Sequence, residues 1–97
     1  MIDIELKPEV YDDLKTAYDW YESQRIGLGE DFLLTLEDSY AKIARTPKAY
    51  QLIYQSVRRK LVRRFPYGVF FVLRDDKIIV IAVMHTKRNP LDLSNRV

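Results

Sequence analysis

VFFVLRDDKIIVIAVM, residues 69–84, is the stretch that decides the fold of this chain. Its two apolar parts, 69–73 and 78–84, are dense in the β-branched and aromatic residues that favour strands. Asp75, Asp76 and Lys77 supply turn residues between them, so the stretch predicts a β-hairpin. Neither part alternates cleanly between apolar and polar residues, which is typical of central strands that are covered, at least in part, on both faces.

Three further segments have the character of strands. Apolar and acidic residues alternate over 2–6, and this period of two predicts a short strand with one buried face. Residues 57–65 are predicted to form another strand, and 50–54 a short extended piece.

Two helices are predicted between the first strand and the others. Pro8 suits a first helical turn, and the apolar residues that follow share one helical face. These residues are Val10, Leu14, Ala17, Tyr18 and Tyr21. Gly27 and Gly29 interrupt the pattern, a second helix is predicted over about 30–45, and Pro47 stops it. Because the link is short, we expect an antiparallel helical hairpin.

The elements follow the order β-α-α-β-β-β, which predicts an α+β fold with an antiparallel sheet packed against an N-terminal helical hairpin. A chain of 97 residues has the length of one domain, and no repeat, linker or low-complexity segment divides 1–97. The sequence starts without the basic and apolar segments of a signal peptide. It also lacks a run of about 18 apolar residues. We therefore expect a single cytoplasmic domain.

The composition excludes several kinds of site. The chain has no cysteine, which excludes disulfides, thiol catalysis and thiolate metal sites. One histidine is too few for a His-rich metal site, and carboxylates on a helix give a metal site little support without His or Cys. We expect neither a metal nor a cofactor.

Charge is distributed unevenly along the chain. Residues 1–40 carry 3 basic and 11 acidic side chains, a net charge of −8, whereas residues 41–97 carry 13 and 3, a net charge of +10. The overall charge of +2 therefore hides a strong dipole. A surface of this kind attracts polyanions or an acidic partner.

The basic end is concentrated in the predicted strand 57–65. Strand alternation places Arg59 and Arg63 on one face, and Arg58, Lys60 and Arg64 on the other. One face must meet the helices, so about half of these cations are expected on an open sheet face. Such a face suits a phosphate group or an acidic partner. The alternative is a solvated edge strand whose charge resists aggregation.

His85 follows an apolar strand and precedes two further cations. Acid–base work on a phosphodiester needs a proton acceptor, a proton donor and cations for the developing charge. His85, Tyr67, Arg88 and Arg59 are the residues that could be assembled for that work. The alternative is a structural histidine whose ring hydrogen bonds hold the tail to the sheet.

Trp20 falls off the apolar face of the first predicted helix, whereas Tyr18 and Tyr21 fit it. An exposed tryptophan can anchor a partner. The alternative is a tryptophan that packs against a loop.

The order and spacing of several short segments resemble the ParE branch of the RelE/ParE toxin family. The first half contributes an acidic helix that ends near Trp20-Tyr21, then Gly27-Leu28-Gly29-Glu30-Asp31-Phe32 and Pro47-Lys48-Ala49-Tyr50. The second half contributes Val57-Arg58, Arg64-Phe65-Pro66-Tyr67, 69–73, Ile81-Ala82-Val83-Met84-His85 and Arg88-Asn89-Pro90. The similarity spans about 4–93, nearly the whole chain.

The resemblance implies the fold reached above and adds a function. A ParE-like protein is the toxin of a type II toxin–antitoxin (plasmid stabilisation) system. It inhibits growth by inhibiting DNA gyrase, is not an enzyme, and is neutralised by a cognate antitoxin. The antitoxin is expected to lay an amphipathic, acidic segment along the helical hairpin and the sheet. The expected target and antitoxin contacts are Arg58, Arg59, Lys60, Arg63, Arg64, Tyr67, Lys87, Arg88 and Trp20.

The RelE branch implies a different activity, a metal-independent endoribonuclease that cuts mRNA in the ribosomal A site. Arg59 and Arg88 would then clamp phosphate, and His85 would act as acid or base. A third interpretation, a basic nucleic-acid-binding domain, lacks a helix-turn-helix or RRM signature.

The nuclease pattern is incomplete in this sequence. Gly68 stands where RelE-like enzymes have an arginine that opens a strand, and Leu61 stands where they have a second sheet cation. The final residues, 91–97, contain no tyrosine. Loss of a fixed cation beside the reacting phosphate lowers a rate on the order of a hundredfold or more.

Overall fold

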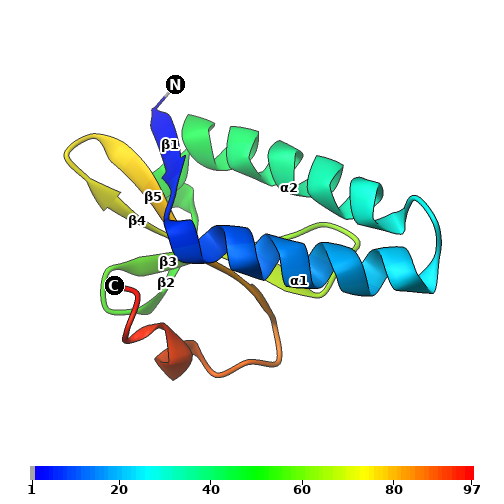
Figure 1. Cartoon of the computed structure of the whole chain (residues 1–97). Helices are drawn as coiled ribbons and strands as arrows, with labels where there is room; N and C mark the ends of the chain where they lie inside the picture. Colours follow the sequence, from blue (N-terminus) through cyan, green and yellow to red (C-terminus); the bar gives the residue numbers. More distant parts are fainter. Residues whose placement is uncertain (1) are drawn as a thin grey trace.

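The computed structural model describes residues 2–97 and shows two helices packed against one five-stranded sheet (Figure 1). The helices are α1 (Pro8–Gln24) and α2 (Leu28–Arg45), and the strands are β1 (Asp3–Leu6), β2 (Gln51–Tyr54), β3 (Val57–Leu61), β4 (Tyr67–Arg74) and β5 (Lys77–His85). Two 3-10 turns, η1 (Pro47–Ala49) and η2 (Pro90–Leu93), precede β2 and follow β5. The predicted α+β fold is confirmed, with 50–54 supplying β2. Within 2–97, no helix is long and apolar enough to cross a membrane.

The sheet is mixed, whereas the sequence predicted an antiparallel one. The strand order is β1-β5-β4-β3-β2, and every pairing except the first is antiparallel. β1 runs parallel to β5, with Asp3 opposite Lys77 and Leu6 opposite Val80. The alternation in β1 indicates which face is buried, but it carries no information on the direction of a partner strand at the other end of the sequence.

β4 and β5 form the predicted hairpin. Arg74 pairs with Lys77, which leaves Asp75 and Asp76 as a two-residue turn. Both aspartates have positive φ, at 50° and 63°, as a type I′ turn requires. Aspartate adopts this left-handed conformation more readily than most residues because its short polar side chain bonds locally.

Each face of the sheet is covered by a different part of the chain. The helices cover one face, where Val10, Phe32, Leu36 and Ile43 pack with Val69, Phe71, Ile78, Val80 and Val83. Leu93 of η2 covers the other face and packs with Val57, Phe70, Val72, Ile81, Ala82 and Met84. Figure 1 shows the helices and this C-terminal segment on opposite sides of the sheet. The prediction that the central strands are covered on both faces is confirmed.

β3 ends at Leu61, before the predicted end at residue 65. Val62 and Phe65 turn inward and join the core beneath the helices. Arg64 has a positive φ of 72°, and the Val62 amide donates to the Tyr67 carbonyl at 2.8 Å. The segment 62–66 is therefore a loop that returns the chain into β4.

Side chains complete the edge of β5 that β1 leaves uncovered. The Val83 amide donates to Oδ2 of Asp13 on α1 at 3.0 Å. Nη1 of Arg96, near the C-terminus, donates to the Ile81 carbonyl at 3.1 Å. Backbone groups that a neighbouring strand would otherwise bind are thus paired with side chains.

Candidate binding surface

Arg58 and Lys60 lie on the helix side of β3, beside the connection from α2 to β2. Nη1 of Arg58 donates to the carbonyls of Tyr50 at 2.7 Å and Lys48 at 3.3 Å. Nζ of Lys60 lies 5.5 Å from the centre of the Tyr50 ring. Partial burial, with the nearby charge of Lys42 as a smaller cause, lowers the pKa of the Lys60 ammonium.

Arg59 lies on the opposite face and covers Gly68. A Cβ atom built at Gly68 would lie 3.1 Å from both Cγ and Cδ of Arg59. This distance is tighter than ordinary van der Waals contact, so a larger residue at 68 would displace the arginine or its neighbours. Leu61 is the direct partner of Gly68 across the β3–β4 pair.

Arg63 and Arg64 both lie beside α2, contrary to the strand alternation that predicted them on opposite faces. They line a pocket of about 250 Å³ together with Asp31, Leu34, Thr35 and Asp38 of α2. Because β3 ends at Leu61, the loop 62–66 carries both arginines toward the helix. The hydrogen bond from Lys42, and more weakly the charges of Arg63 and Lys60, lower the pKa of the Asp38 carboxyl.

The five cations Arg58, Arg59, Lys60, Arg63 and Arg64, which we call the basic ribbon, have no carboxylate partner among residues 2–97. The ion pairs of this part of the chain engage other cations: Lys15, Arg25, Lys42, Lys77, Arg88 and Arg96. The acidic first half thus forms no ion pair with the ribbon, although Asp31 and Asp38 line one pocket with Arg63 and Arg64.

His85 and Arg88 line a separate pocket of about 270 Å³ between α1 and the sheet. Tyr67 lines it as well, with its ring centre 5.4 Å from that of His85. Arg59 lies on the other face of the sheet. The structure thus brings together three of the four residues considered for acid–base chemistry and separates the fourth from them.

Comparison with known proteins decides the family. The family model described as "ParE toxin of type II toxin-antitoxin system, parDE" matches residues 4–90. This chain belongs to the ParE toxin family. Among solved structures, it is similar to a chain of the "Chromosomal ParDE TA system from P. aeruginosa", with a TM-score of 0.78 and 13% sequence identity over 88% of this chain and 96% of that chain. At this identity the likeness concerns the fold. No curated protein matches the sequence.

Trp20 of this ParE-family chain is exposed near the tip of the helical hairpin. Its side chain is 59% exposed, and Ile26, in the turn between the helices, is 90% exposed. Trp20 is thus exposed, as an anchor for a partner would require, and its role in binding stays a prediction. Lys87, the remaining predicted contact, lies in the exposed turn after β5.

An apolar groove between the two helices was not singled out from the sequence. It has a volume of about 360 Å³ and is lined by Leu14, Lys15 and Tyr18 of α1 and by Glu30 and Leu33 of α2. The spacing of Leu14 and Tyr18 on α1 was a signal for it. The sequence predicts both residues on the apolar face of α1, and the structure places them at the outer margin of that face.

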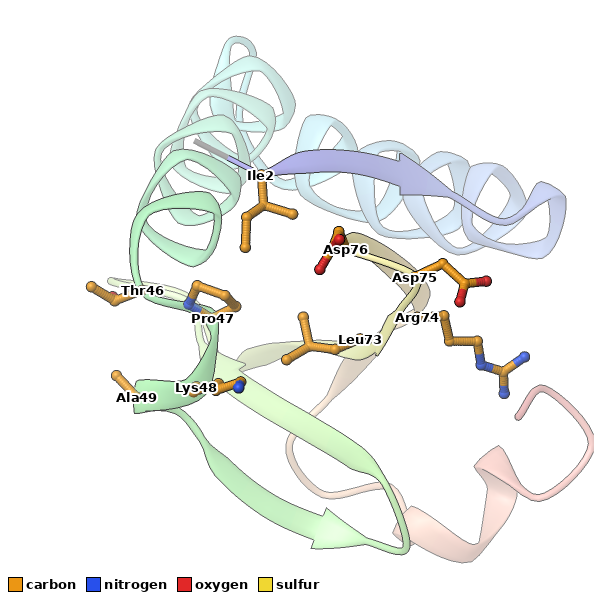
Figure 2. Close-up of a pocket in the computed structure, with 9 residues that line it drawn as sticks. All are labelled: Ile2, Thr46, Pro47, Lys48, Ala49, Leu73, Arg74, Asp75 and Asp76. Carbon is orange, nitrogen blue, oxygen red and sulfur yellow. The ribbon is translucent and has the colours of Figure 1, made fainter.

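A larger pocket of about 530 Å³ was also missed (Figure 2). Ile2 and Leu73 project into it, whereas Arg74 and Asp75 point away, as Figure 2 shows. Its walls come from the start of the chain, the connection after α2 and the β4–β5 turn. A local sequence pattern does not predict a pocket whose residues come from three distant segments of the chain.

Proposed function

We propose that this ParE-family protein is the toxin of a type II toxin–antitoxin pair, that it inhibits DNA gyrase, and that a cognate antitoxin neutralises it. We also propose that it acts in the cytoplasm, where gyrase works. The proposed contacts with target or antitoxin are the basic ribbon, Tyr67, Lys87, Arg88 and Trp20.

The observation that carries this proposal is the position of Arg59 over Gly68. The RelE-like pattern needs cations at positions 61 and 68, which are neighbours across the β3–β4 pair. Here Leu61 supplies an apolar side chain, and the stem of Arg59 fills the space in front of Gly68. A single arginine at this corner is poorly suited to balance the charge that develops on a phosphodiester during cleavage. The face is better suited to binding than to cutting.

The helical hairpin and the basic ribbon offer an antitoxin two complementary surfaces. The groove at Leu14, Tyr18 and Leu33 is mostly apolar and suits the apolar side of an amphipathic segment. The unpaired cations of the ribbon suit the acidic residues of the same segment. Charges of this kind raise the rate of association and make binding sensitive to salt.

One observation favours the nuclease alternative. His85, Tyr67 and Arg88 share one pocket, so a proton donor and a cation do meet there. A RelE-like, ribosome-dependent endoribonuclease that used this pocket would have to work without Arg59, because that side chain lies on the other face of the sheet.

Two assays run side by side test the proposal. Purified protein is expected to inhibit supercoiling by DNA gyrase and to leave mRNA in a translating extract uncut, as read by primer extension. Uninhibited gyrase together with cuts in the ribosomal A site would overturn the proposal in favour of the nuclease. Antitoxin binding is tested with the product of a small adjacent reading frame, which should bind the wild type and bind an Arg63→Ala/Arg64→Ala variant more weakly. The charge-matched control is Arg25→Ala/Arg74→Ala.

A further inference from the structure

The sheet ends in two open edges. β1 and β2 are its outermost strands, and among residues 2–97 no strand pairs with the outer side of either. Charged residues and prolines commonly protect such an edge from pairing with another chain. β2, with the sequence QLIY, contains neither, and its Leu52 is 51% exposed. The edge at β2 is therefore free to pair with a further strand.

The outer edge of β1 has backbone groups that no strand within 2–97 binds, and it lies beside an apolar groove. The Lys7 amide, just after β1, donates to the Val80 carbonyl of β5 at 3.0 Å. Successive residues of a strand point their N–H and C=O groups to opposite sides, so Ile4 and Leu6 point theirs outward. A groove of about 520 Å³ lies between this edge and α2, with Ile2, Ile4, Tyr40, Ala41 and Ala44 among its lining residues. Edge and groove together offer hydrogen bonds and an apolar seat to an incoming strand.

The strand directions let one copy of the chain extend the sheet of another. β1 runs parallel to β5, and the pairings from β5 through β4 and β3 to β2 are all antiparallel. β2 therefore runs opposite to β1. A second copy in the same orientation, placed beside β1, presents its β2 antiparallel to β1 and keeps its helices on the same side of the sheet. The sheet can thus continue across two copies without turning either one over.

The exposed leucine of β2 fits the groove beside β1. Leu52 is paired with Arg58 across the β2–β3 ladder, and paired side chains lie on one face of a sheet. Since Arg58 lies on the helix side, Leu52 does so as well. The groove is also on the helix side, because Ile2 and Ile4 pack against the core beneath the helices. In the continued sheet, Leu52 of one copy therefore points into the groove of the next.

The two edges carry opposite charge. Asp3 and Glu5 alternate with the inward residues of β1, so they lie on the face away from the helices. Glu5 contacts Lys77 at 3.1 Å, whereas Asp3 forms no ion pair within 2–97. Residues 46–60, which include β2, carry four cations and no carboxylate, and Arg59 lies on the same face as the two acidic residues. An acidic and a basic edge attract each other, whereas two equal edges repel.

We propose that copies of this chain associate head to tail, with β2 of one copy adding antiparallel to β1 of the next. Two strands of four residues each make a small interface of the weak, transient class, so the association depends on protein concentration. Because each added copy leaves an open edge at both ends, further copies can join. This inference goes beyond the proposed function and does not depend on the choice of gyrase as target.

Sedimentation velocity of the wild-type protein tests the association. We expect the weight-average sedimentation coefficient to rise with protein concentration. The association constant should fall when sodium chloride is raised, since salt screens the attraction between the edges. A sedimentation coefficient that stays at the monomer value up to about 1 mM protein would overturn the proposal, because even a weak interface is populated at that concentration.

Two substitutions of equal charge separate edge pairing from general attraction. Leu52→Asp is expected to weaken association at least about tenfold, because it puts a carboxylate into an apolar groove. Leu61→Asp is the matched control, since Leu61 is 54% exposed but lies on β3, an inner strand. It should change association less than about twofold, because a single exposed charge away from the interface is screened. Equal weakening by both substitutions would assign the association to net charge and overturn the proposal.

Cross-linking shows which edges meet, because the chain has no cysteine of its own. Glu5→Cys protein is mixed with Gln51→Cys protein and treated with a short bismaleimide. We expect the mixed dimer in excess of either homodimer. In the control, Lys15→Cys on the exposed side of α1 replaces Glu5→Cys and should give little mixed dimer. An excess of Glu5→Cys homodimer, or equal linking in the control, would overturn the head-to-tail arrangement.

Discussion

Arg96 binds Asp13 through both ends of its guanidinium, with Nη1 at 2.6 Å from Oδ2 and Nη2 at 3.0 Å from Oδ1. The pair is mostly buried, with side-chain exposures of 21% and 10%. It joins the C-terminal segment to α1 across the uncovered edge of β5. The hydrogen bond to Asp13, with its negative charge as a further cause, raises the pKa of the Arg96 guanidinium.

Removal of the Arg96 charge is expected to destabilise the protein. Arg96→Met leaves Asp13 partly buried with only the Val83 amide as partner, and we expect the free energy of unfolding to fall by about 2–4 kcal/mol. Urea denaturation measures the change. The control is Lys77→Met, which removes the exposed pair with Glu5 and should cost at most about 1 kcal/mol. Equal losses in both variants would contradict a special role for Arg96.

A side chain at Gly68 is expected to act through Arg59. Gly68→Ala should lower the free energy of unfolding by about 1 kcal/mol, because its Cβ meets the Arg59 stem and the Phe70 ring edge. The cost should shrink in an Arg59→Ala background, where the stem is absent. A double-mutant cycle by chemical denaturation gives the coupling. Zero coupling would mean that the contact between the two residues does not constrain position 68.

The Tyr40 hydroxyl is buried and has no hydrogen-bond partner within 2–97. Tyr40→Phe removes an unsatisfied polar group, so the free energy of unfolding should stay unchanged or rise by up to about 1–2 kcal/mol. Tyr11→Phe is the control, because that side chain is 61% exposed. A loss of more than about 1 kcal/mol in Tyr40→Phe would indicate that the hydroxyl has a partner after all.

Burial raises the pKa of Tyr40 from 10.0 to about 12, with the Tyr11 and Glu37 charges as smaller causes. The folded state thus holds the phenolic proton more tightly than the unfolded state does. The associated stability is complete below pH 10 and is lost as the pH rises from 10 to about 12. We expect the wild type to lose more stability than Tyr40→Phe between pH 9.5 and 11.5, as measured by denaturation at each pH. Equal losses of stability in the wild type and in Tyr40→Phe over this pH range would contradict the assignment of the raised pKa to Tyr40.

Glu22 holds the turn between the helices. Its two carboxylate oxygens accept from the amides of Gly27 and Gly29, each at 3.0 Å. These amides belong to the cap and first turn of α2, so Glu22→Ala should lower the free energy of unfolding by about 1–2 kcal/mol. Glu37→Ala, on the exposed side of α2, is the control. Amide hydrogen exchange should locate the loss at Gly27 and Gly29, and unchanged protection there would contradict the prediction.

Local patterns were enough to predict the elements of the fold. The β4–β5 hairpin follows from β-branched runs around Asp75 and Asp76, and the helices follow from apolar residues repeated on one helical face. The parallel pairing of β1 with β5 could not be predicted from local patterns. It depends on how α1 and α2 pack and on where the chain re-enters the sheet. The end of β3 did not follow either. It is set by the burial of Val62 and Phe65 beneath the helices, which is a tertiary effect.

The residues of the site were easier to name than to place. Charge density singled out the basic ribbon, whose role in binding stays a prediction. The expectation that about half of its cations lie on an open sheet face was wrong, because of the five only Arg59 lies on the face away from the helices. The joint position of Arg63 and Arg64 beside α2 could not be predicted, because it depends on the loop after Leu61. Asp13 and Arg96 looked like ordinary surface charges in the sequence, since no local signal connects residues at opposite ends of a chain.

The parallel pairing of β1 with β5 has a consequence for synthesis of this ParE toxin. β1 leaves the ribosome before its partner β5, and both helices and three strands lie between them in the sequence. The β1–β5 pairing is therefore non-local, and non-local pairings slow folding. Until β5 has emerged, the helical hairpin presents its apolar face without the sheet strand that should cover it, a state prone to aggregation. The nascent toxin thus completes its sheet only after β5 has left the ribosome.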